Sequence, residues 1–300
     1  MPTEGVEPTL PCGKRILSPS RTLEIGCFVF ILGRGRGGYS LVTFWMGFDI
    51  FKRVVASLTR KWKRWMAVSC THGHLADPCA TKAMLAFRKS YAPHHVLHLG
   101  DFTDMAALRA GARRDADDPD RAESMADDLL AGLSFLQELE PSTIHLGNHE
   151  DRLCGLAHSG NAVVSYAAGQ VLGKIEDFAK KIKAKVVPYA GLRPEACTLL
   201  GDTLFLHGVI FSMSAARDHA ETLGMSCVFG HTHRVAQEQG RTQRPVTGYN
   251  IGCGLDLNVG YAKTRRATLG WSHGFAYGEY NDQACTVNLV TLSPHYRLPL

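Results

Sequence analysis

Short apolar runs that end in a polar turn recur five times between Met66 and residue 235. Each turn combines glycine with Cys, His, Asp or Asn. Continuous apolar runs bounded by turns predict buried strands. In open α/β sheets, ligands bind beyond the carboxyl ends of the strands, so the five turns are candidates for a ligand site. The runs are residues 67–69, 96–99, 142–146, 203–206 and 227–229.

Helix-like stretches lie between these runs. Residues 82–91 predict one helix, and residues 106–139 predict two helices with a break around residues 115–121. Residues 161–185 carry apolar side chains at helical spacing and predict an amphipathic helix. Alternation of strands and helices indicates the α/β class. After Lys185 strands dominate, which predicts a second, more antiparallel sheet.

The stretch Gly147-Asn148-His149-Glu150-Asp151 concentrates four polar side chains directly after a run. Burying unpaired polar groups costs several kcal/mol each, so these four side chains must lie in a cleft, in solvent or around a metal ion. Amide oxygen and imidazole nitrogen are both metal ligands, which makes Asn148 and His149 candidates for a metal site.

Residues 1–65 differ from the remainder in charge, with 11 Lys/Arg against 4 Asp/Glu, whereas residues 66–300 have 22 against 24. Two apolar runs, residues 27–32 and 41–51, are shorter than the ~20 residues of a membrane span, so no transmembrane segment is expected. We expect residues 1–65 to be an N-terminal extension, either poorly ordered or upstream sequence translated from a wrong start, with Met66 as the natural start. The basic residues 57–65 also suit a membrane surface or an RNA backbone.

A chain of 300 residues with 45% hydrophobic content is enough for one large or two modest domains with a substantial core, and we expect residues 66–300 to form one domain. Nine cysteines without a regular framework favour a reducing compartment, and we expect a cytoplasmic protein. The sequence predicts no particular oligomeric state.

In order along the chain, the five turns resemble the motifs of the calcineurin-like metallophosphoesterase superfamily. Those enzymes show Asp-x-His, Gly-Asp-x-x-Asp, Gly-Asn-His-Glu, a lone His and Gly-His-x-His. The corresponding stretches here are Cys70-Thr71-His72, Gly100-Asp101-Phe102-Thr103-Asp104, Gly147-Asn148-His149-Glu150, His207-Gly208 and Gly230-His231-Thr232-His233. The resemblance covers about residues 66–235 and implies a four-layer α/β/β/α sandwich of two mixed sheets flanked by helices. Gly147-Asn148-His149-Glu150-Asp151-Arg152 looks most like the stand-alone phosphoesterases of bacteria and their phages.

The resemblance also implies a dinuclear metal centre. Carried over by motif, Cys70, His72 and His233 would hold one divalent metal ion, Asn148, His207 and His231 would hold a second, and Asp101 would bridge both. Two cations that share one carboxylate can neutralise a phosphoryl group under in-line attack. His149 would then act on the substrate as general acid or transition-state donor, oriented by Asp104.

Cys70 departs from the superfamily pattern, which has Asp at this position. A thiolate keeps the negative charge of the carboxylate but is a softer ligand, so it favours Zn or Fe over Mn or Mg. RNA lariat debranching enzymes also have Cys-x-His in this motif. The alternatives are a Cys70 that does not coordinate, or a degenerate enzyme.

Other polar residues near the motifs have less specific interpretations. His74 and Arg152 are candidates for contact with the substrate phosphate. His98 and His145 precede motifs on predicted strands and are expected to be hydrogen-bonded core residues. The acidic residues 115–128 are expected to form a solvated face or loop.

The sequence favours a metal-dependent phosphodiesterase or nuclease that acts on nucleic acid or nucleotides. Protein phosphatases of the superfamily resemble one another in carrying Arg directly after Gly-Asp-x-x-Asp, whereas Met105 follows Asp104 here. The alternatives are a phosphomonoesterase for a small metabolite or phosphoprotein, and a metal-binding scaffold without catalysis. The presence of both His149 and Asp104 argues against the scaffold.

Overall fold

The structure is a computed structural model that describes residues 27–35, 38–46, 61–108, 125–260, 270–292 and 298. The chain divides into two units, Met1–Arg60 and Lys61–Leu300. In the first unit, strands β1 (Cys27–Gly35) and β2 (Gly38–Met46) pair antiparallel. The second unit begins at Lys61, ahead of the domain start expected at Met66.

A six-stranded mixed sheet forms the first half of the second unit, in the order β13-β12-β3-β4-β5-β6. The four strands β3 to β6 pair in parallel, and β12 pairs antiparallel with both β3 and β13. The bounds are β3 (Lys63–Val68), β4 (His95–His98), β5 (Thr143–His145), β6 (Lys185–Val187), β12 (Gly274–Tyr280) and β13 (Asn288–Thr291).

A five-stranded mixed sheet forms the other half, in the order β10-β11-β9-β8-β7. Strand β9 pairs in parallel with β8 and with β11, and the two outer strands pair antiparallel with their neighbours. The bounds are β7 (Thr198–Leu200), β8 (Thr203–Leu206), β9 (Ser226–Phe229), β10 (Val235–Gln239) and β11 (Thr247–Ile251).

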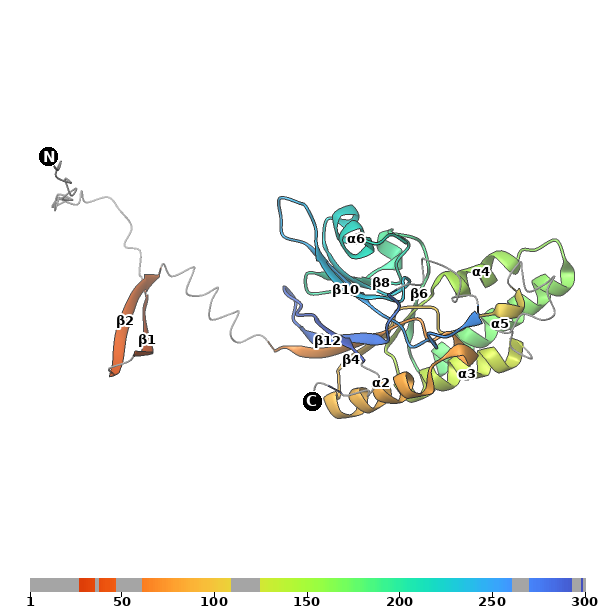
Figure 1. The fold of residues 1–300 in the computed structure, drawn as a ribbon, viewed down its shortest axis with the longest axis horizontal. Coiled ribbons are helices and arrows are strands. Elements are labelled where there is room, and N and C mark those ends of the chain that lie inside the picture. Colours follow the sequence, from red (N-terminus) through yellow and green to blue (C-terminus); the bar gives the residue numbers. More distant parts are fainter. Residues whose placement is uncertain are drawn as a thin grey trace. The chain divides into compact units, whose positions relative to one another are not determined.

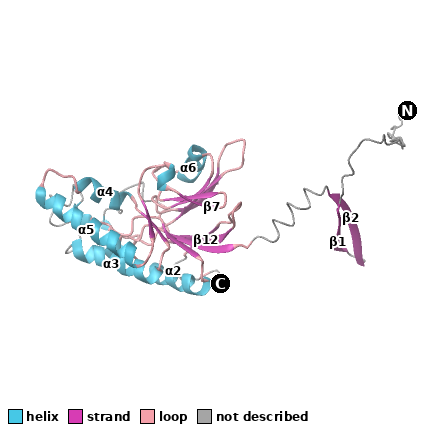
Figure 2. Ribbon diagram, turned by 180° about the vertical axis from the view of Figure 1, so that it is seen from behind, coloured by secondary structure: helices cyan, strands magenta, loops and turns pink. Residues whose placement is uncertain are grey.

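Helices cover the outer faces of both sheets (Figures 1 and 2). In Figure 1, α2 and α3 lie along the side of the six-stranded sheet, and α6 lies on the opposite side of the molecule, over the five-stranded sheet. The predicted four-layer α/β/β/α architecture is therefore confirmed. The bounds are α2 (Pro78–Tyr91), α3 (Met125–Leu139), α4 (Asn148–Leu156), α5 (Ala162–Lys181) and α6 (Ala215–Leu223), with short 3-10 turns η1 (Gly73–Leu75), η2 (Ala106–Leu108) and η3 (Pro194–Ala196).

Burial on both faces explains why strand β3 is a continuous apolar run in the sequence. Side chains alternate between the two faces of a strand, and both faces of β3 are covered. Trp65 and Ala67 face the second sheet, in a cluster with Phe205 and Val228. Met66 and Val68 belong to the cluster beneath α2 and α3. The strand thus joins two hydrophobic cores.

The predicted helices form, with caps that the sequence contains. Asp77 accepts a hydrogen bond from the Ala80 amide at 2.7 Å and begins α2 ahead of the expected residue 82. Asn161 accepts from the Val163 and Val164 amides at 3.0 and 3.2 Å and begins α5. Of the two helices expected over residues 106–139, α3 is present, and the break around residues 115–121 lies outside the described residues.

Three segments differ from the sequence expectation. Helix α6 lies in a region where strands were expected to dominate. It forms because four of its nine residues are buried, and it packs on the outer face of the five-stranded sheet. Asn148 and His149 open helix α4 rather than lying in a turn. Residues 274–280, for which the sequence pattern singled out no strand, form the interior strand β12. Among the described residues, no helix is long and apolar enough to span a membrane.

Trp65 provides a test of where the folded unit begins. Its side chain is fully buried, and its ring lies edge-on to Phe205 with centroids 4.7 Å apart, whereas Trp62 is 41% exposed. We expect Trp65→Ala to lower the free energy of unfolding by about 3–5 kcal/mol, because it leaves a large cavity between the sheets. Trp62→Ala is the matched control. Equal urea midpoints for the two variants would show that Trp65 lies outside the folded core.

Candidate metal centre

All five polar turns meet where the parallel strands of the two sheets end. Three follow the neighbouring strands β3, β4 and β5, and two follow the neighbouring strands β8 and β9. Because adjacent parallel strands end at the same sheet edge, residues that are far apart in sequence come together there. The five motifs therefore form one site.

The first cluster at this edge consists of Cys70, His72, Asp101 and His233. One ligand atom from each of these residues lies within 4.8 Å of the others. His72 Nε2 lies 3.2 Å from His233 Nε2 and 3.9 Å from Asp101 Oδ2. All four side chains are buried.

The second cluster shares Asp101 with the first. Asp101, His207 and His231 form a further group whose ligand atoms lie within 4.8 Å of one another. Asp101 Oδ2 is 3.2 Å from His207 Nε2. The Asn148 side-chain oxygen lies 3.1 Å from His207 Nε2 and 3.0 Å from His231 Nδ1, so Asn148 belongs to the same cluster.

The donor atoms fit divalent cations. His207 Nδ1 donates to the Leu99 carbonyl at 2.7 Å, which leaves the lone pair of Nε2 for the second cluster. His72 Nδ1 faces Asp104 Oδ1 at 3.1 Å, which in the same way leaves its Nε2 for the first cluster. Nitrogen, oxygen and sulfur atoms that converge in buried space, without enough protons to satisfy one another, are the groups that a cation compensates.

The backbone at these residues is unusual. Cys70, His72, Asp101, His231 and His233 all have φ between 53° and 64°. Non-glycine residues rarely adopt this left-handed conformation, and such residues cluster at functional sites that the surrounding structure holds in place. Five of the seven expected metal ligands, those that follow β3, β4 and β9, thus share this strained backbone conformation.

His149 lies beside the two clusters. Its Nδ1 lies 2.7 Å from the Asp104 backbone carbonyl and 3.4 Å from the Asp104 carboxylate, which is nearer to His72. The contact between His149 and Asp104 is therefore present, but the shorter hydrogen bond goes to the backbone. Burial lowers the pKa of His149, while the carboxylates of Asp101 and Asp104 act in the opposite direction.

The charges around Asp101 favour its ionised form. Burial alone would raise the pKa of Asp101, but the imidazoles of His207 and His149 hold that pKa well below its usual range. Burial, and next the charge of Asp101, raise the pKa of the Cys70 thiol well above its usual range. Since a thiolate is the form that binds metal, a cation at Cys70 would have to displace a proton.

Glu150 connects the second and third motifs. It is fully buried, and its carboxylate accepts hydrogen bonds from the amides of Asp101, Thr103 and Gly147 at 2.8–2.9 Å and from the Thr103 hydroxyl at 2.9 Å. A Cβ atom at Gly147 would lie 2.1 Å from Asp101 Oδ1, so only glycine permits this close approach of the two loops. Glu150 thus holds Asp101 in position without contacting a ligand site itself.

Asp128 connects the first and second motifs, and for this residue the sequence expectation was wrong. We expected residues 115–128 to be solvated, but Asp128 is only 1% exposed, whereas residues 115–124 lie outside the described residues. Its carboxylate accepts from the His74 amide at 3.3 Å and from the Asp104 and Met105 amides at 3.2 and 2.5 Å. Nothing in the sequence distinguishes Asp128 from its acidic neighbours, because its partners lie on loops that are distant in the chain.

The two expected substrate contacts, His74 and Arg152, come from different elements, η1 and α4. His74 Nδ1 lies 3.0 Å from Asp128 Oδ1, and the His74 side chain is 21% exposed. Arg152 lies one turn after His149 on α4, and it contributes to lowering the pKa of His149, after burial and His72. His74 therefore has a structural partner, and contact of either residue with substrate stays a prediction.

The histidines before the motifs are core residues, as expected. His98 Nε2 contacts the Thr71 hydroxyl at 3.2 Å, and His145 Nε2 contacts the Thr198 hydroxyl at 3.0 Å. Burial lowers the pKa of each of these histidines to about 3. Both are therefore neutral near pH 7 and fix neighbouring segments by hydrogen bonds.

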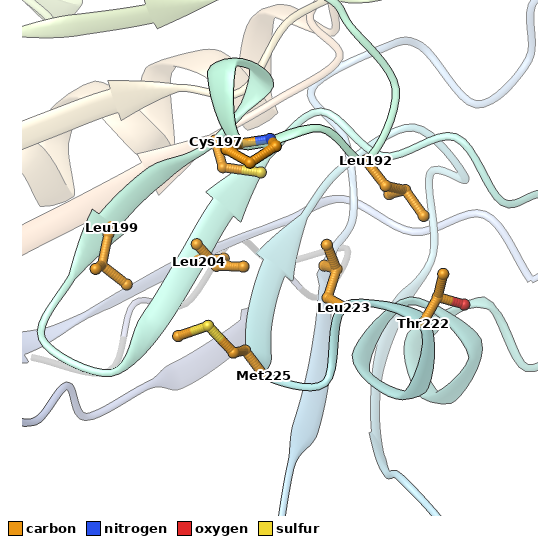
Figure 3. Close-up of a pocket in the computed structure, with 8 residues that line it drawn as sticks. Leu192, Cys197, Leu199, Leu204, Thr222, Leu223 and Met225 are labelled. Carbon is orange, nitrogen blue, oxygen red and sulfur yellow. The ribbon is translucent and has the colours of Figure 1, made fainter.

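An apolar cavity of about 450 Å³ lies beside β7, β8 and the end of α6 (Figure 3). Figure 3 shows Leu199 and Leu204 on adjacent strands, with Thr222 and Leu223 of α6 beside them. The residues that line it are Leu192, Pro194, Cys197, Leu199, Leu204, Thr222, Leu223 and Met225. None of the candidate ligands belongs to this lining, so the cavity is separate from the metal centre.

No protein-family model and no curated protein matches the chain. Among solved structures, it is similar to an uncharacterized protein from Streptococcus pneumoniae described as a predicted phosphoesterase, with 17% identity, a TM-score of 0.32, and 77% of this chain and 90% of that chain covered. It is also similar to YfcE, a phosphoesterase from E. coli, with 15% identity, a TM-score of 0.34, and coverage of 77% and 100%. A Vps29 single mutant from Entamoeba histolytica shares 13% identity, with a TM-score of 0.38 and coverage of 78% and 94%.

The chain itself combines two mixed sheets flanked by helices with clustered His, Asp and Cys side chains at the ends of its parallel strands. This fold and this placement of potential metal ligands are what the resemblance to the calcineurin-like metallophosphoesterases implied.

The role of Asp128 as a connector can be measured on chelator-treated protein. Asp128→Asn keeps one oxygen but turns an amide group toward backbone N–H donors. We expect the free energy of unfolding to fall by about 1–3 kcal/mol, the cost of leaving buried donors unsatisfied. Asp127→Asn changes the exposed neighbour and is expected to stay within about 0.5 kcal/mol of wild type. If both variants unfold at the wild-type urea concentration, Asp128 does not connect the loops.

Proposed function

We propose that this chain is a metal-dependent phosphoesterase with a dinuclear metal centre. Cys70, His72, Asp101 and His233 hold one divalent ion, and Asp101, Asn148, His207 and His231 hold the other. The observation that carries the proposal is the position of Asp101, whose carboxylate belongs to both ligand clusters. A shared carboxylate is the arrangement that places two cations close enough to act on one phosphate.

The ions, when bound, supply positive charge that stabilises the phosphoryl group during in-line attack. The chain's own residues do the remainder. His149 has its Nδ1 fixed by the Asp104 carbonyl at 2.7 Å, which leaves Nε2 for the substrate. Burial on balance lowers the pKa of His149, so the neutral form with a free Nε2 lone pair is favoured. In the imidazolium form, which the Asp101 and Asp104 carboxylates favour, Nε2 would carry the proton for the oxygen of the departing group.

The ligand set bears on which metals bind. Cys70 is buried beside Asp101 and accepts the His231 amide at 3.2 Å, so its sulfur points into the first cluster. A soft thiolate selects Zn or Fe at this position, whereas the oxygen and nitrogen ligands of the second cluster also accept Mn. We therefore propose a centre with Zn or Fe in the first position and Zn, Fe or Mn in the second.

The favoured substrates are phosphodiesters, in nucleic acid or nucleotides. Protein phosphatases that share these motifs carry a phosphate-binding arginine directly after Gly-Asp-x-x-Asp. Here Met105 follows Asp104 at that position, and the Met105 side chain is buried. His74 and Arg152 remain the proposed contacts to the non-bridging phosphate oxygens. A panel of monoesters, diesters, cyclic nucleotides and single- and double-stranded nucleic acids, assayed with Zn, Fe and Mn, tests this substrate class.

The catalytic assignment depends on His149. We expect His149→Ala to lower kcat for bis(4-nitrophenyl) phosphate by about 10²- to 10⁴-fold, since it removes the proton donor, while metal content stays at the wild-type value. His158→Ala is the matched control, because His158 is an exposed histidine just beyond the same helix. Turnover by His149→Ala equal to that of wild type would contradict the assignment.

The metal assignment depends on Cys70. After loading with zinc and dialysis, we expect wild-type protein to retain two ions and Cys70→Ala to retain one, as measured by elemental analysis. The reason is that the first cluster loses its only thiolate. Cys79→Ala changes an exposed cysteine on α2 and should retain both ions. Equal zinc content and equal metal preference in Cys70→Ala would make Cys70 a bystander.

A further inference from the structure

The loop between β8 and α6 exposes large apolar side chains at the edge of the metal centre. Phe211 is 48% exposed and Met213 is 79% exposed. The loop begins directly after His207, one of the candidate ligands. Large apolar side chains that remain exposed beside a concentration of polar ligands are candidates for contact with a bound molecule.

Phe211 lies against the centre itself. Its ring is 5.8 Å from the ring of His231, with an angle of 79° between the planes. His231 belongs to the second ligand cluster and contacts the Asn148 oxygen at 3.0 Å, so Phe211 packs directly against that cluster. A phosphate ester bound at that cluster would carry its organic group toward the rim on which Phe211 lies.

Buried groups hold this loop in a defined conformation. His219 Nε2 accepts from the Val209 and Ile210 amides at 3.0 and 3.3 Å, while His219 Nδ1 donates to the Ala215 carbonyl at 2.7 Å. These bonds fix the start of the loop to helix α6. Because two amides donate to Nε2, His219 is neutral, which agrees with a pKa lowered to about 4, mainly by burial.

Arg234 fixes the other half of the loop. Its guanidinium donates to the Ser212 carbonyl at 2.5 Å and to Met213 Sδ at 3.1 Å, and it lies 5.7 Å from the centre of the Phe211 ring. The Arg234 side chain is buried, so its apolar stem packs while its charge sits beneath the loop. Phe211 and Met213 are therefore presented to solvent by a rigid support, with a cation beside the aromatic ring.

We propose that Phe211 and Met213 form a stacking subsite for a nucleobase whose phosphate occupies the metal centre. A flat aromatic ring and a polarizable thioether, pre-positioned by buried partners, bind planar π-systems without a large loss of conformational entropy. Stacking on an aromatic side chain accepts any base, so the subsite selects nucleotides or nucleic acid over esters without a base. This inference rests on the proposed function for the position of the phosphate.

Direct binding measures the subsite without requiring turnover. Calorimetry on the zinc-loaded protein compares AMP with ribose 5-phosphate, which lacks only the base. We expect wild type to bind AMP at least about fivefold more tightly, the smallest effect typical of base stacking on an aromatic ring. Phe211→Ala should remove most of this preference, and Phe211→Trp should preserve it. Leu199→Ala, which changes another exposed apolar residue on β7, is the control and should keep the wild-type ratio.

Turnover gives the second measurement. Thymidine 5′-(4-nitrophenyl phosphate) and methyl 4-nitrophenyl phosphate release the same leaving group and differ in the base-carrying side. We expect the ratio of their kcat/KM values to favour the thymidine ester by at least about fivefold in wild type and to fall toward one in Phe211→Ala.

The outcomes separate the subsite from the hydrolytic function. The subsite is overturned, and the phosphoesterase is not, if three results occur together. Both esters are hydrolysed, Phe211→Ala leaves the ratio of their kcat/KM values unchanged, and AMP and ribose 5-phosphate bind with equal affinity. A Phe211-dependent preference for AMP without hydrolysis supports the subsite and overturns the phosphoesterase. Absence of both hydrolysis and preference overturns both. Wild-type metal content in Phe211→Ala shows that the centre itself is undisturbed.

Discussion

A buried carboxylate, that of Asp101, is the group around which the second unit is arranged. An ionised side chain that is 2% exposed is stable only if opposite charge and hydrogen bonds replace the lost water. His207 and His72 approach one of its oxygens, and the His149 amide donates to the other at 3.0 Å. Two sheets must end side by side to bring these partners together, so the four-layer fold and the charge at its centre depend on each other.

Two further buried acids turn this local requirement into a connected structure. Glu150 joins the loops after β4 and β5, and Asp128 joins the loops after β3 and β4. Each accepts several backbone N–H groups that the sharp turns leave without partners in the sheets. These bonds offset the cost of holding residues such as Cys70 and Asp101 at positive φ. The site is therefore rigid because its supports are carboxylates rather than apolar contacts alone.

Aromatic rings pack against three histidines of the centre. Tyr189, Phe211 and Trp271 each lie against one histidine of the site, with ring centroids 5.7, 5.8 and 4.4 Å apart. They come from three segments that are distant in sequence. Rings packed against imidazoles limit their rotation and exclude water, which strengthens electrostatic interactions at the site. The rim thus supports the ligands on one side and presents apolar surface on the other.

The sequence by itself determined the parallel strands, the turns after them and the residues that converge there. Each ligand directly follows its strand, so strand order and covalent connection suffice to place Cys70, Asp101 and Asn148 at one edge. Only the tertiary structure revealed the burial of Asp128, the helix α6 and the position of Phe211. Their partners are separated from them by loops or sheets. The local sequence of an acidic run or a short amphipathic segment does not distinguish a buried position from a solvated one. The local sequence pattern specifies which residues follow a strand. The packing of distant segments decides which other side chains those residues contact.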